Sequence, residues 1–342
     1  MVMSITISIP TLNPKIPDLR AAIDSCECQT EKPSEILIVD GGSKNINEIQ
    51  DLIRAFPDLS IVTKPGILLS ENRKIAVERC RGDYLIFLDC DDVLSPFFVE
   101  TVTRLSKSNP DVIIFGSGDQ EQKTLPDISS QMVIEGSQSI QTYFLRFDRS
   151  YLKPELRSVW AKAFRTDFLR TNNLPEDRPV VQGEDQIMMY WVSFLAKRIV
   201  SLPSFVSYRY RIHPYSTSVT FDPKKVDDFR HLENRLTDCL SRCGANQDKW
   251  QEFYYATSCE YSIRLLNAFF CNSRNLEKRS KRYSDFKKLM QTDQYYRESI
   301  KRCRLSTCPS FGKKGLLFLY KLSWFKPIFN YYDRKKQAIS PK

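Results

Sequence analysis

The feature that most constrains the fold is a regular alternation of apolar and helical segments over the first 115 residues. Five short runs rich in Ile, Val and Leu are separated by longer stretches with helical periodicity. The apolar runs are residues 5–9, 36–39, 59–62, 84–88 and 112–115, and the helical stretches are 19–28, 46–56, 71–80 and 97–106. This order predicts an α/β fold with a mostly parallel sheet covered by helices on both faces.

Polar side chains follow several of these runs at the point where the predicted strand ends. Thr11 and Asn13 follow the first run, Asp40 follows the second, and residues 89–92 (Asp-Cys-Asp-Asp) follow the fourth. In sheets of this class, ligands bind outside the carboxyl ends of the strands. We therefore expect the binding site to lie among these residues.

The acidic segment at residues 89–92 is the strongest local signal for chemistry. Three carboxylates within four residues repel one another, so a fold keeps them together where a cation or hydrogen-bond donors offset the repulsion. An Asp-x-Asp pair at a strand end suits Mg²⁺ or Mn²⁺, which retain waters and bridge substrate phosphates. The alternative is an N-terminal cap for the following helix, formed by Asp92 or Ser95. Taken alone, the segment leaves both interpretations open.

The charge of the chain is concentrated at one end. The 342 residues include 51 Lys and Arg against 41 Asp and Glu, a net charge of +10. Residues 301–342 hold eleven basic residues and one acid, Asp333, so they account for the whole excess. A neutral body with a basic appendage does not indicate a nucleic-acid-binding protein, and we expect no nucleic-acid partner.

The basic segment also carries many apolar side chains between its lysines. A stripe of four apolar residues on one helix face predicts an interfacial segment on an anionic membrane, with aromatic rings buried and lysines on the headgroups. The stripe is Leu316, Leu317, Tyr320 and Trp324. The alternatives are a helix packed on the body and a contact surface for a partner protein.

The cysteines and the lengths of the apolar runs indicate the cellular compartment of the protein. The ten cysteines are scattered through the chain, and the first ten residues lack the basic start of a secretory signal. We expect reduced cysteines and a cytoplasmic protein, which the basic segment would place on the cytoplasmic face of the membrane. No run approaches the roughly 18 apolar residues that a membrane-spanning helix needs.

Six segments in a fixed order resemble the family 2 glycosyltransferases. They are ITISIPTLN, SEILIVDGGSKN, GDYLIFLDCDDVLSP, SVWAKAFRTDFL, GEDQIMMYWVSF and YRYRIHPYSTS, spread over residues 4–220. The resemblance implies a GT-A fold with a Rossmann-like sheet, followed here by a C-terminal helical extension. It also implies a metal-dependent enzyme that uses Mg²⁺ or Mn²⁺ to transfer a sugar from a nucleoside-diphosphate sugar, with a UDP-sugar favoured. The expected acceptor is a sugar or a lipid-linked saccharide, in bacterial surface polysaccharide synthesis.

The resemblance further implies roles for individual residues. Those expected to line the nucleotide-sugar pocket are Pro10, Thr11, Asn13, Asp40, Arg73 and Asp89. Those expected in the acceptor or diphosphate region are Trp160, Lys162, Glu184 and Arg211. Asp91 would hold the metal ion, His213 could join it, and Asp185 would be the catalytic base. Two positions depart from the family pattern, which often has Asp at Gly41 and usually has Asn at Lys74.

Elementary chemistry supports the same roles. Displacement of a nucleoside diphosphate builds negative charge on the leaving group, which a metal ion stabilises without a general acid. The acceptor hydroxyl must lose a proton, and a carboxylate on the opposite side of the sugar can accept it, which predicts inversion. Asp185 begins an apolar helix whose dipole favours the ionised form. The alternatives are that Asp185 only initiates this helix, that Trp160 is a core residue, and that Arg211 and His213 are polar ends of a surface strand.

These observations divide the chain into three expected regions. They are a glycosyltransferase domain at 1–220 (nucleotide-sugar half 1–116, acceptor half 117–220), a helical extension at 221–302 and a basic aromatic tail at 303–342. The alternative function is a catalytically silent nucleotide-sugar-binding or scaffold subunit of a polysaccharide assembly complex. A processive synthase is disfavoured because the chain has neither membrane spans nor a Gln-x-x-Arg-Trp motif.

Overall fold

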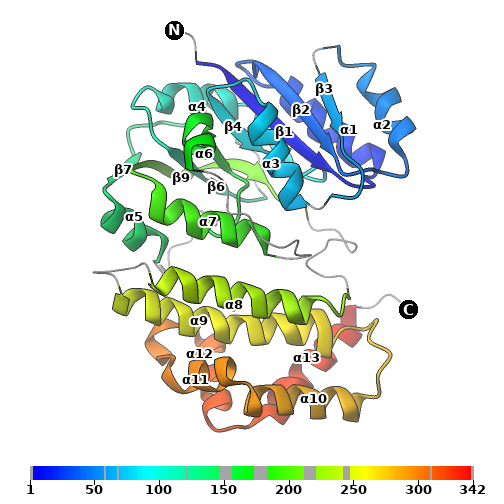
Figure 1. Ribbon diagram of the computed structural model, residues 1–342, viewed down its shortest axis with the longest axis vertical. Helices are drawn as coiled ribbons and strands as arrows, with labels where there is room; N and C mark the ends of the chain where they lie inside the picture. Colours follow the sequence, from blue (N-terminus) through cyan, green and yellow to red (C-terminus); the bar gives the residue numbers. More distant parts are fainter. Residues whose placement is uncertain are drawn as a thin grey trace. The chain divides into compact units, whose positions relative to one another are not determined.

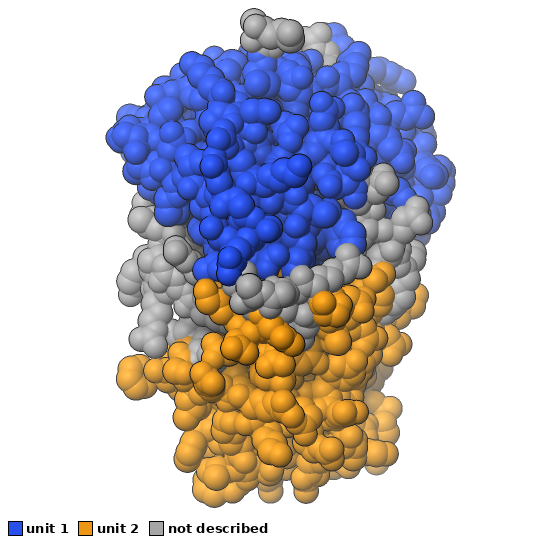
Figure 2. All heavy atoms as spheres, turned by 60° about the vertical axis from the view of Figure 1, so that its left-hand side comes forward, with its two compact units in different colours: residues 1–144, 150–180, 184–212 blue, residues 145–149, 181–183, 213–342 orange. Residues whose placement is uncertain are grey.

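The computed structural model divides the chain into two compact units, coloured separately in Figure 2. Unit 1 comprises residues 1–144, 150–180 and 184–212, and unit 2 comprises 145–149, 181–183 and 213–342. The residues described are 3–57, 59–67, 69–119, 122–145, 156–172, 183–211, 221–241, 247–308 and 310–339. Within these ranges, unit 1 holds all the strands, and the elements of unit 2 are helices.

The described residues of unit 1 form a nine-stranded sheet. Its order is β3-β2-β1-β4-β8-β6-β9-β5, with β7 paired to β9. The strands are β1 (Ile5–Thr11), β2 (Glu35–Asp40), β3 (Leu59–Thr63), β4 (Tyr84–Phe87), β5 (Val93–Leu94), β6 (Val112–Ser117), β7 (Met132–Glu135), β8 (Lys162–Arg165) and β9 (Arg198–Arg209). Only β5, β7 and β8 run against the common direction. The predicted mostly parallel sheet is confirmed.

Helices cover both faces of this sheet (Figure 1). One face carries α1 (Ile16–Glu27), α2 (Ile46–Ile53) and α4 (Phe98–Ser106), and the other carries α3 (Leu69–Arg79), α5 (Ser137–Phe144), α6 (Thr166–Asn172) and α7 (Glu184–Leu195). Strand β2 illustrates why helices are needed on both faces. Ile36 and Ile38 share a buried cluster with Leu19 of α1, whereas Leu37 and Val39 belong to the cluster on the opposite face. A strand buried on both sides requires apolar residues at consecutive positions.

Two segments of unit 1 differ from the prediction. The apolar run at residues 205–212 predicts a strand there, but strand β9 begins earlier, at Arg198, because residues 199–202 pair with β6. The polar composition of residues 116–135 predicts an irregular segment, but this segment ends in β7, which pairs with β9. Both differences arise from pairing between distant segments, which local composition does not encode.

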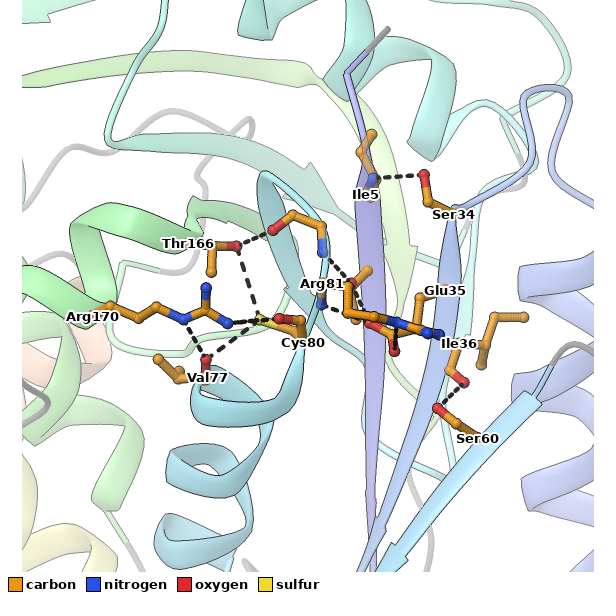
Figure 3. Close-up of polar contacts among 12 residues, drawn as sticks. Ile5, Ser34, Glu35, Ile36, Ser60, Val77, Cys80, Arg81, Thr166 and Arg170 are labelled. Atoms are coloured by element: carbon orange, nitrogen blue, oxygen red, sulfur yellow. Dashed lines mark hydrogen bonds and ion pairs between the residues drawn. The ribbon is translucent and has the colours of Figure 1, made fainter.

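A polar network fixes the C-terminal end of α3, the helix that carries two residues of the candidate site (Figure 3). Arg170 of α6 donates to the carbonyl of Val77 at 3.0 Å and to that of Cys80 at 2.6 Å. Nε of Arg81 donates to the buried carboxylate of Glu35 on β2 at 3.0 Å. The last carbonyls of a helix have no intrahelical partner, so these bonds tie α3 to both α6 and β2.

Unit 2 is built from helices (yellow to red in Figure 1). They are α8 (Lys225–Ser241), α9 (Gln247–Leu265), the π-helix η2 (Leu266–Phe270), α10 (Arg279–Thr292), α11 (Gln294–Arg302), the 3₁₀ turn η3 (Leu305–Thr307), α12 (Phe311–Lys321) and α13 (Phe325–Ile339). The expected basic aromatic tail at residues 303–342 contains α12 and α13. Helix α12 packs on α11, and α13 packs on α10 and η2, so both helices belong to unit 2. Among the described residues, no helix is both long and apolar enough to cross a membrane.

Glu233 of α8 is a fully buried carboxyl group in unit 2. Its Oε2 lies 3.3 Å from Nη1 of Arg230. Burial raises the pKa of Glu233 to about 8, against the opposing effects of Arg230 and a hydrogen bond from Tyr296. Because the raised pKa belongs to the folded state, the stabilising contribution is complete below about pH 4.5 and is lost as the pH rises through about 8.

We expect Glu233→Gln to remove this pH dependence and to raise the free energy of unfolding at about pH 8 by about 2–4 kcal/mol. Urea denaturation at about pH 5 and pH 8, followed by circular dichroism, measures the effect. Glu252→Gln is the matched control, because Glu252 is a solvent-accessible glutamate on α9. If Glu233→Gln and the native protein lose equal stability between the two pH values, Glu233 is already ionised in the folded state.

Candidate active site

Four predicted site residues form one buried ion cluster around Arg73 of α3. Nη2 of Arg73 lies 3.9 Å from Oδ1 of Asp89, and Nη1 lies 3.2 Å from Oε1 of Glu184. Nη1 also forms an ion pair with Oδ1 of Asp185, and the guanidinium side chain is only 4 % exposed. Asp89 follows β4, and Glu184 and Asp185 begin α7, so the fold joins three distant parts of the sequence. We call these four residues the arginine cluster.

The charges of the arginine cluster are strongly coupled. Burial alone would lower the pKa of Arg73, but the carboxylates of Asp185, Glu184 and Asp89 outweigh it and raise that pKa. Desolvation raises the pKa of Asp89 well above its usual range, with Arg73 opposing the rise. Desolvation and then the charge of Asp185 raise the pKa of Glu184, again against Arg73. Three carboxylates share one guanidinium, so removal of that cation would leave them uncompensated.

Asp185, the predicted base, is held on two sides. Its Oδ1 pairs with Arg73, and its Oδ2 accepts a hydrogen bond from the backbone N–H of Val159 at 3.2 Å. The side chain remains 19 % exposed. Asp185 lies in the first turn of α7. A fixed orientation together with partial access to solvent is what a general base requires.

Asp92 is a fully buried part of the acidic turn. It accepts hydrogen bonds from the hydroxyl of Tyr208 at 2.8 Å and from the backbone N–H of Arg211 at 2.7 Å. Burial raises the pKa of Asp92 to about 6, although these two bonds oppose the rise. Asp92 does not cap helix α4, whose N-cap residue is Phe97, whereas Oγ of Ser95 accepts from the backbone N–H of Phe97 at 3.4 Å.

Asp91 has a side chain with acceptor positions that are free to bind a cation. Its side chain is partly exposed and accepts no hydrogen bond from any residue that the structure describes. Its carbonyl accepts from Nε of Arg211, whose Nη1 lies 3.6 Å from Oδ1 of Asp18. Arg211, expected near the diphosphate, thus braces the backbone that carries Asp91.

The donor set around Asp91 fits a divalent cation that shares its coordination with a substrate. Within the described ranges, no group of three His, Cys, Asp or Glu side chains is arranged to hold a metal. Mg²⁺, however, usually takes only one or two protein carboxylates and completes its shell with waters and phosphate oxygens. Asp91 can supply such a carboxylate. His213, predicted as a further ligand, lies outside the described residues.

Asp40 organises the loop that follows β2. Its buried carboxylate accepts from Oγ1 of Thr11 at 3.2 Å and from the backbone N–H groups of Gly42 and Ser43 at 2.9 and 3.0 Å. The hydroxyl of Ser43 donates a fourth bond. A carboxylate has about four acceptor positions, and all are used here. In this geometry the carboxylate of Asp40 therefore has no acceptor position left for the hydrogen bond that we expected from the base or the ribose.

The loops after β1 and β2 are joined to each other and to α3. Pro10 and Thr11 end β1, and Asn13, at φ +50°, accepts from the N–H of Lys44 through Oδ1 at 2.8 Å. The buried amide of Asn72 donates to the carbonyls of Thr11 and Val39 at 3.4 and 3.3 Å. Since Asn72 precedes Arg73, these bonds place the ends of β1 and β2 beside the arginine cluster.

Lys162 and Trp160 shape the segment that positions Asp185. Lys162 is fully buried, and its Nζ donates to the carbonyls of Ser158 at 2.6 Å and Trp160 at 3.2 Å. This places Lys162 behind the segment 158–160 and not among groups exposed to an acceptor, where we expected it. The Trp160 ring is partly exposed and stacks on Tyr208, with ring centroids 5.1 Å apart.

Two contributors to the site were not anticipated from the sequence. Asn72 bridges the strand ends, and Tyr208 links β9 to the acidic turn by accepting from the N–H of Asp89 at 3.2 Å and donating to Asp92. The alternation in YRYR was a usable signal, because it places Tyr208 and Tyr210 on the same side of a strand. Asn72 had no comparable signal.

Comparison with known proteins agrees with this geometry. Residues 6–171 match the model of the glycosyl transferase family 2. The putative glycosyltransferase EpsH of Bacillus subtilis (strain 168) is 22 % identical over 311 residues, which cover 88 % of this chain and 86 % of that protein. The structure of S. aureus TarS 1–349 in complex with UDP-GlcNAc superposes with a TM-score of 0.61 at 15 % identity, covering 98 % of this chain and 91 % of TarS 1–349.

A second solved structure supports the same fold. The mannosyltransferase PcManGT from Pyrobaculum calidifontis, in complex with GDP-Man and Mn²⁺, gives a TM-score of 0.52 at 14 % identity, covering 99 % of this chain and 87 % of that one. Identities this low are evidence for the fold alone, whereas the family match rests on the sequence itself. The predicted GT-A fold is confirmed, and residues 6–171 of the chain are similar to the family 2 glycosyltransferases.

Proposed function

We propose that this glycosyltransferase moves a sugar from a nucleoside-diphosphate sugar to an acceptor hydroxyl, with inversion at the anomeric carbon. The observation that carries the proposal is the arginine cluster, which holds Asp185 next to the strand end that bears Asp89 and Asp91. Two structural neighbours support the donor class, because one is in complex with UDP-GlcNAc and the other with GDP-Man and Mn²⁺. A UDP-sugar is the first donor to test.

In the proposed reaction, Asp185 accepts the proton of the acceptor hydroxyl as that oxygen attacks the anomeric carbon. Arg73 and the N–H of Val159 hold the carboxylate in one orientation, which lowers the cost of aligning base and acceptor. Attack from the side opposite the leaving diphosphate inverts the anomeric configuration. Acidic groups on the donor side make direct contact with a diphosphate unfavourable unless a cation intervenes.

Asp91 would hold Mg²⁺ or Mn²⁺ against the diphosphate, as a single carboxylate ligand. When bound, the ion stabilises the negative charge that develops on the leaving group. Arg211 holds the backbone of Asp91 in place through a hydrogen bond to its carbonyl, and Asp18 in turn forms an ion pair with Arg211. We place the reaction in surface polysaccharide assembly, with a sugar or a lipid-linked saccharide as acceptor.

The test is thermal unfolding in the presence of UDP or GDP, with and without MnCl₂. A ligand that binds only the folded state raises the free energy of unfolding. At a ligand concentration of about 100 times the Kd, the increase is about 2.7 kcal/mol. We expect either UDP or GDP to raise the midpoint temperature of unfolding by several degrees in the presence of Mn²⁺, and by much less in its absence. Asp91→Asn should remove most of the difference that Mn²⁺ makes.

Asp51→Asn is the matched control, because Asp51 is an exposed aspartate of α2 paired with Arg54. It should respond to nucleotide and Mn²⁺ as the native protein does. If neither nucleotide stabilises the native protein under any condition, the proposed donor class is wrong. If nucleotide binds but Mn²⁺ makes no difference to any variant, the assignment of Asp91 as a metal ligand is wrong.

A further inference from the structure

The last two helices of unit 2 present two different faces. Leu317 and Tyr320 of α12 are buried against the rest of the unit, as are Phe325 and Phe329 of α13. The opposite side carries large apolar residues in solvent. These are Phe311, Phe318 and Leu322, at 91 %, 53 % and 44 % exposure. Trp324, which is 59 % exposed, follows in the segment between α12 and α13, and we call these four residues the aromatic face.

The aromatic face differs from the stripe expected from the sequence. Of the four residues in that stripe, Leu317 and Tyr320 are buried in unit 2, and Trp324 is the one that is largely exposed. The expectation failed because the segment packs one side on its own unit, so the surface is made by other residues. Phe311, Phe318 and Leu322 recur at spacings of seven and four and therefore share one side of α12.

Lysines lie next to residues of the aromatic face in the sequence, and one of them also lies close in space. Lys314 lies with its Nζ 5.4 Å from the centroid of the Phe311 ring. Lys321 and Lys326 are exposed near Leu322 and Trp324 in the sequence. No acid of the segment 301–342 offsets them at the surface, because its single acid is Asp333.

Asp333 is occupied inside unit 2. It is 4 % exposed, its Oδ2 accepts from Nε of Arg279 at 2.7 Å, and its Oδ1 lies 3.2 Å from Nη1 of Arg282. Lys313, by contrast, forms an ion pair with Glu260 and does not contribute to the free positive charge. The surface of α12 and the start of α13 is therefore apolar and cationic at once.

We propose that the aromatic face binds the surface of an anionic lipid bilayer. Aromatic and leucine side chains enter the headgroup boundary, and lysines beside them contact phosphates of the lipid headgroups. A Trp ring at the edge of such a face suits the interface, where one end is apolar and the other is wet. A second copy of the chain fits poorly, since two such faces would bring lysines against lysines. Membrane binding is independent of the proposed sugar transfer.

The test is cosedimentation of the full chain with vesicles of phosphatidylcholine alone or with about 30 % phosphatidylglycerol. We expect binding to the anionic vesicles only, and weaker binding as salt is added. The double variant Phe311→Ser/Phe318→Ser should weaken binding by about tenfold or more, because it removes two groups that enter the bilayer. Both positions are exposed, so the variant should fold, which circular dichroism checks.

Two control variants match the chemistry at other surfaces. Leu276→Ser removes a leucine that is 97 % exposed in the segment before α10, and Lys287→Gln/Lys288→Gln removes two exposed charges of α10. Both should bind the vesicles as the native chain does. Lys314→Gln/Lys326→Gln should instead bind less and lose most of the salt dependence.

A second readout follows Trp324 directly. Vesicles with brominated acyl chains quench tryptophan that enters the bilayer, so quenching should occur in the native chain and disappear in Trp324→Phe. Failure of the native chain to bind anionic vesicles would overturn the proposal. It would also be overturned if light scattering found a dimer that Phe311→Ser/Phe318→Ser converts to a monomer without lipid, since the face would then be a protein interface.

Discussion

Replacement of Asp185 by Asn should slow sugar transfer by about 10³-fold while changing the affinity for the nucleotide sugar by less than about threefold. The amide has nearly the same shape as the carboxylate and can still accept a hydrogen bond from Val159, but it cannot take a proton from the acceptor. Steady-state release of nucleoside diphosphate measures the rate, and isothermal titration with donor and Mn²⁺ measures the affinity. A large loss of rate with intact binding is specific to a catalytic base.

Asp167→Asn is the matched control for this substitution. Asp167 is an exposed acid in the first turn of α6, as Asp185 is an acid in the first turn of α7. If Asp185 only initiated its helix, both substitutions would cost a similar few tenths of a kcal/mol, on the order of 0.5, and neither would change the rate much. Equal activity of Asp185→Asn and Asp167→Asn would remove the catalytic assignment.

The second large effect is expected at Arg73. Arg73→Met should slow transfer by about 10²-fold or more and reduce the stability by about 3 kcal/mol at neutral pH, because three carboxylates lose their shared cation. Without the positive charge of Arg73, ionisation of the carboxyl groups in the cluster costs more free energy. The acidic limb of the pH–rate profile should therefore move to higher pH by about one unit or more. The stability deficit should shrink at low pH, where the carboxylates are protonated.

Arg73→Lys provides the conservative comparison. It keeps the positive charge but loses the planar fork that reaches several carboxylates at once. We expect its pH–rate profile to stay close to that of the native protein, with an intermediate loss of rate. If Arg73→Met and Arg73→Lys lose the same activity and neither shifts the profile, Arg73 acts through packing alone.

Much of unit 1 could be predicted because its signals are local. Consecutive apolar residues such as Ile36 to Val39 mark a strand that is buried on both faces, and parallel strands place their carboxyl ends at one edge. That geometry brings the polar residues that follow β1, β2 and β4 to one edge of the sheet. The start of β9 was missed because its first residues are strand through pairing with β6.

The pairing of side chains at the site could not be predicted in the same way. Asp40 and Asp91 are both acids after strands, yet the first is saturated by four donors and the second accepts none from described residues. Lys162 faces backbone carbonyls, and Arg73 faces carboxylates. These differences depend on rotamers and on loop paths, which the spacing of residues along the chain does not determine. The two faces of α12 are a further case, because packing within unit 2 decided which residues stayed exposed.

The most direct measurement is the anomeric configuration of the transferred sugar. Proton NMR of the product formed from an α-linked nucleotide sugar of gluco or galacto configuration distinguishes α from β by the coupling between the anomeric proton and H2. A single displacement with Asp185 as base predicts the β product, formed by the native protein and not by Asp185→Asn. An α product would contradict the proposed mechanism, because retention requires a second displacement or a different side of attack.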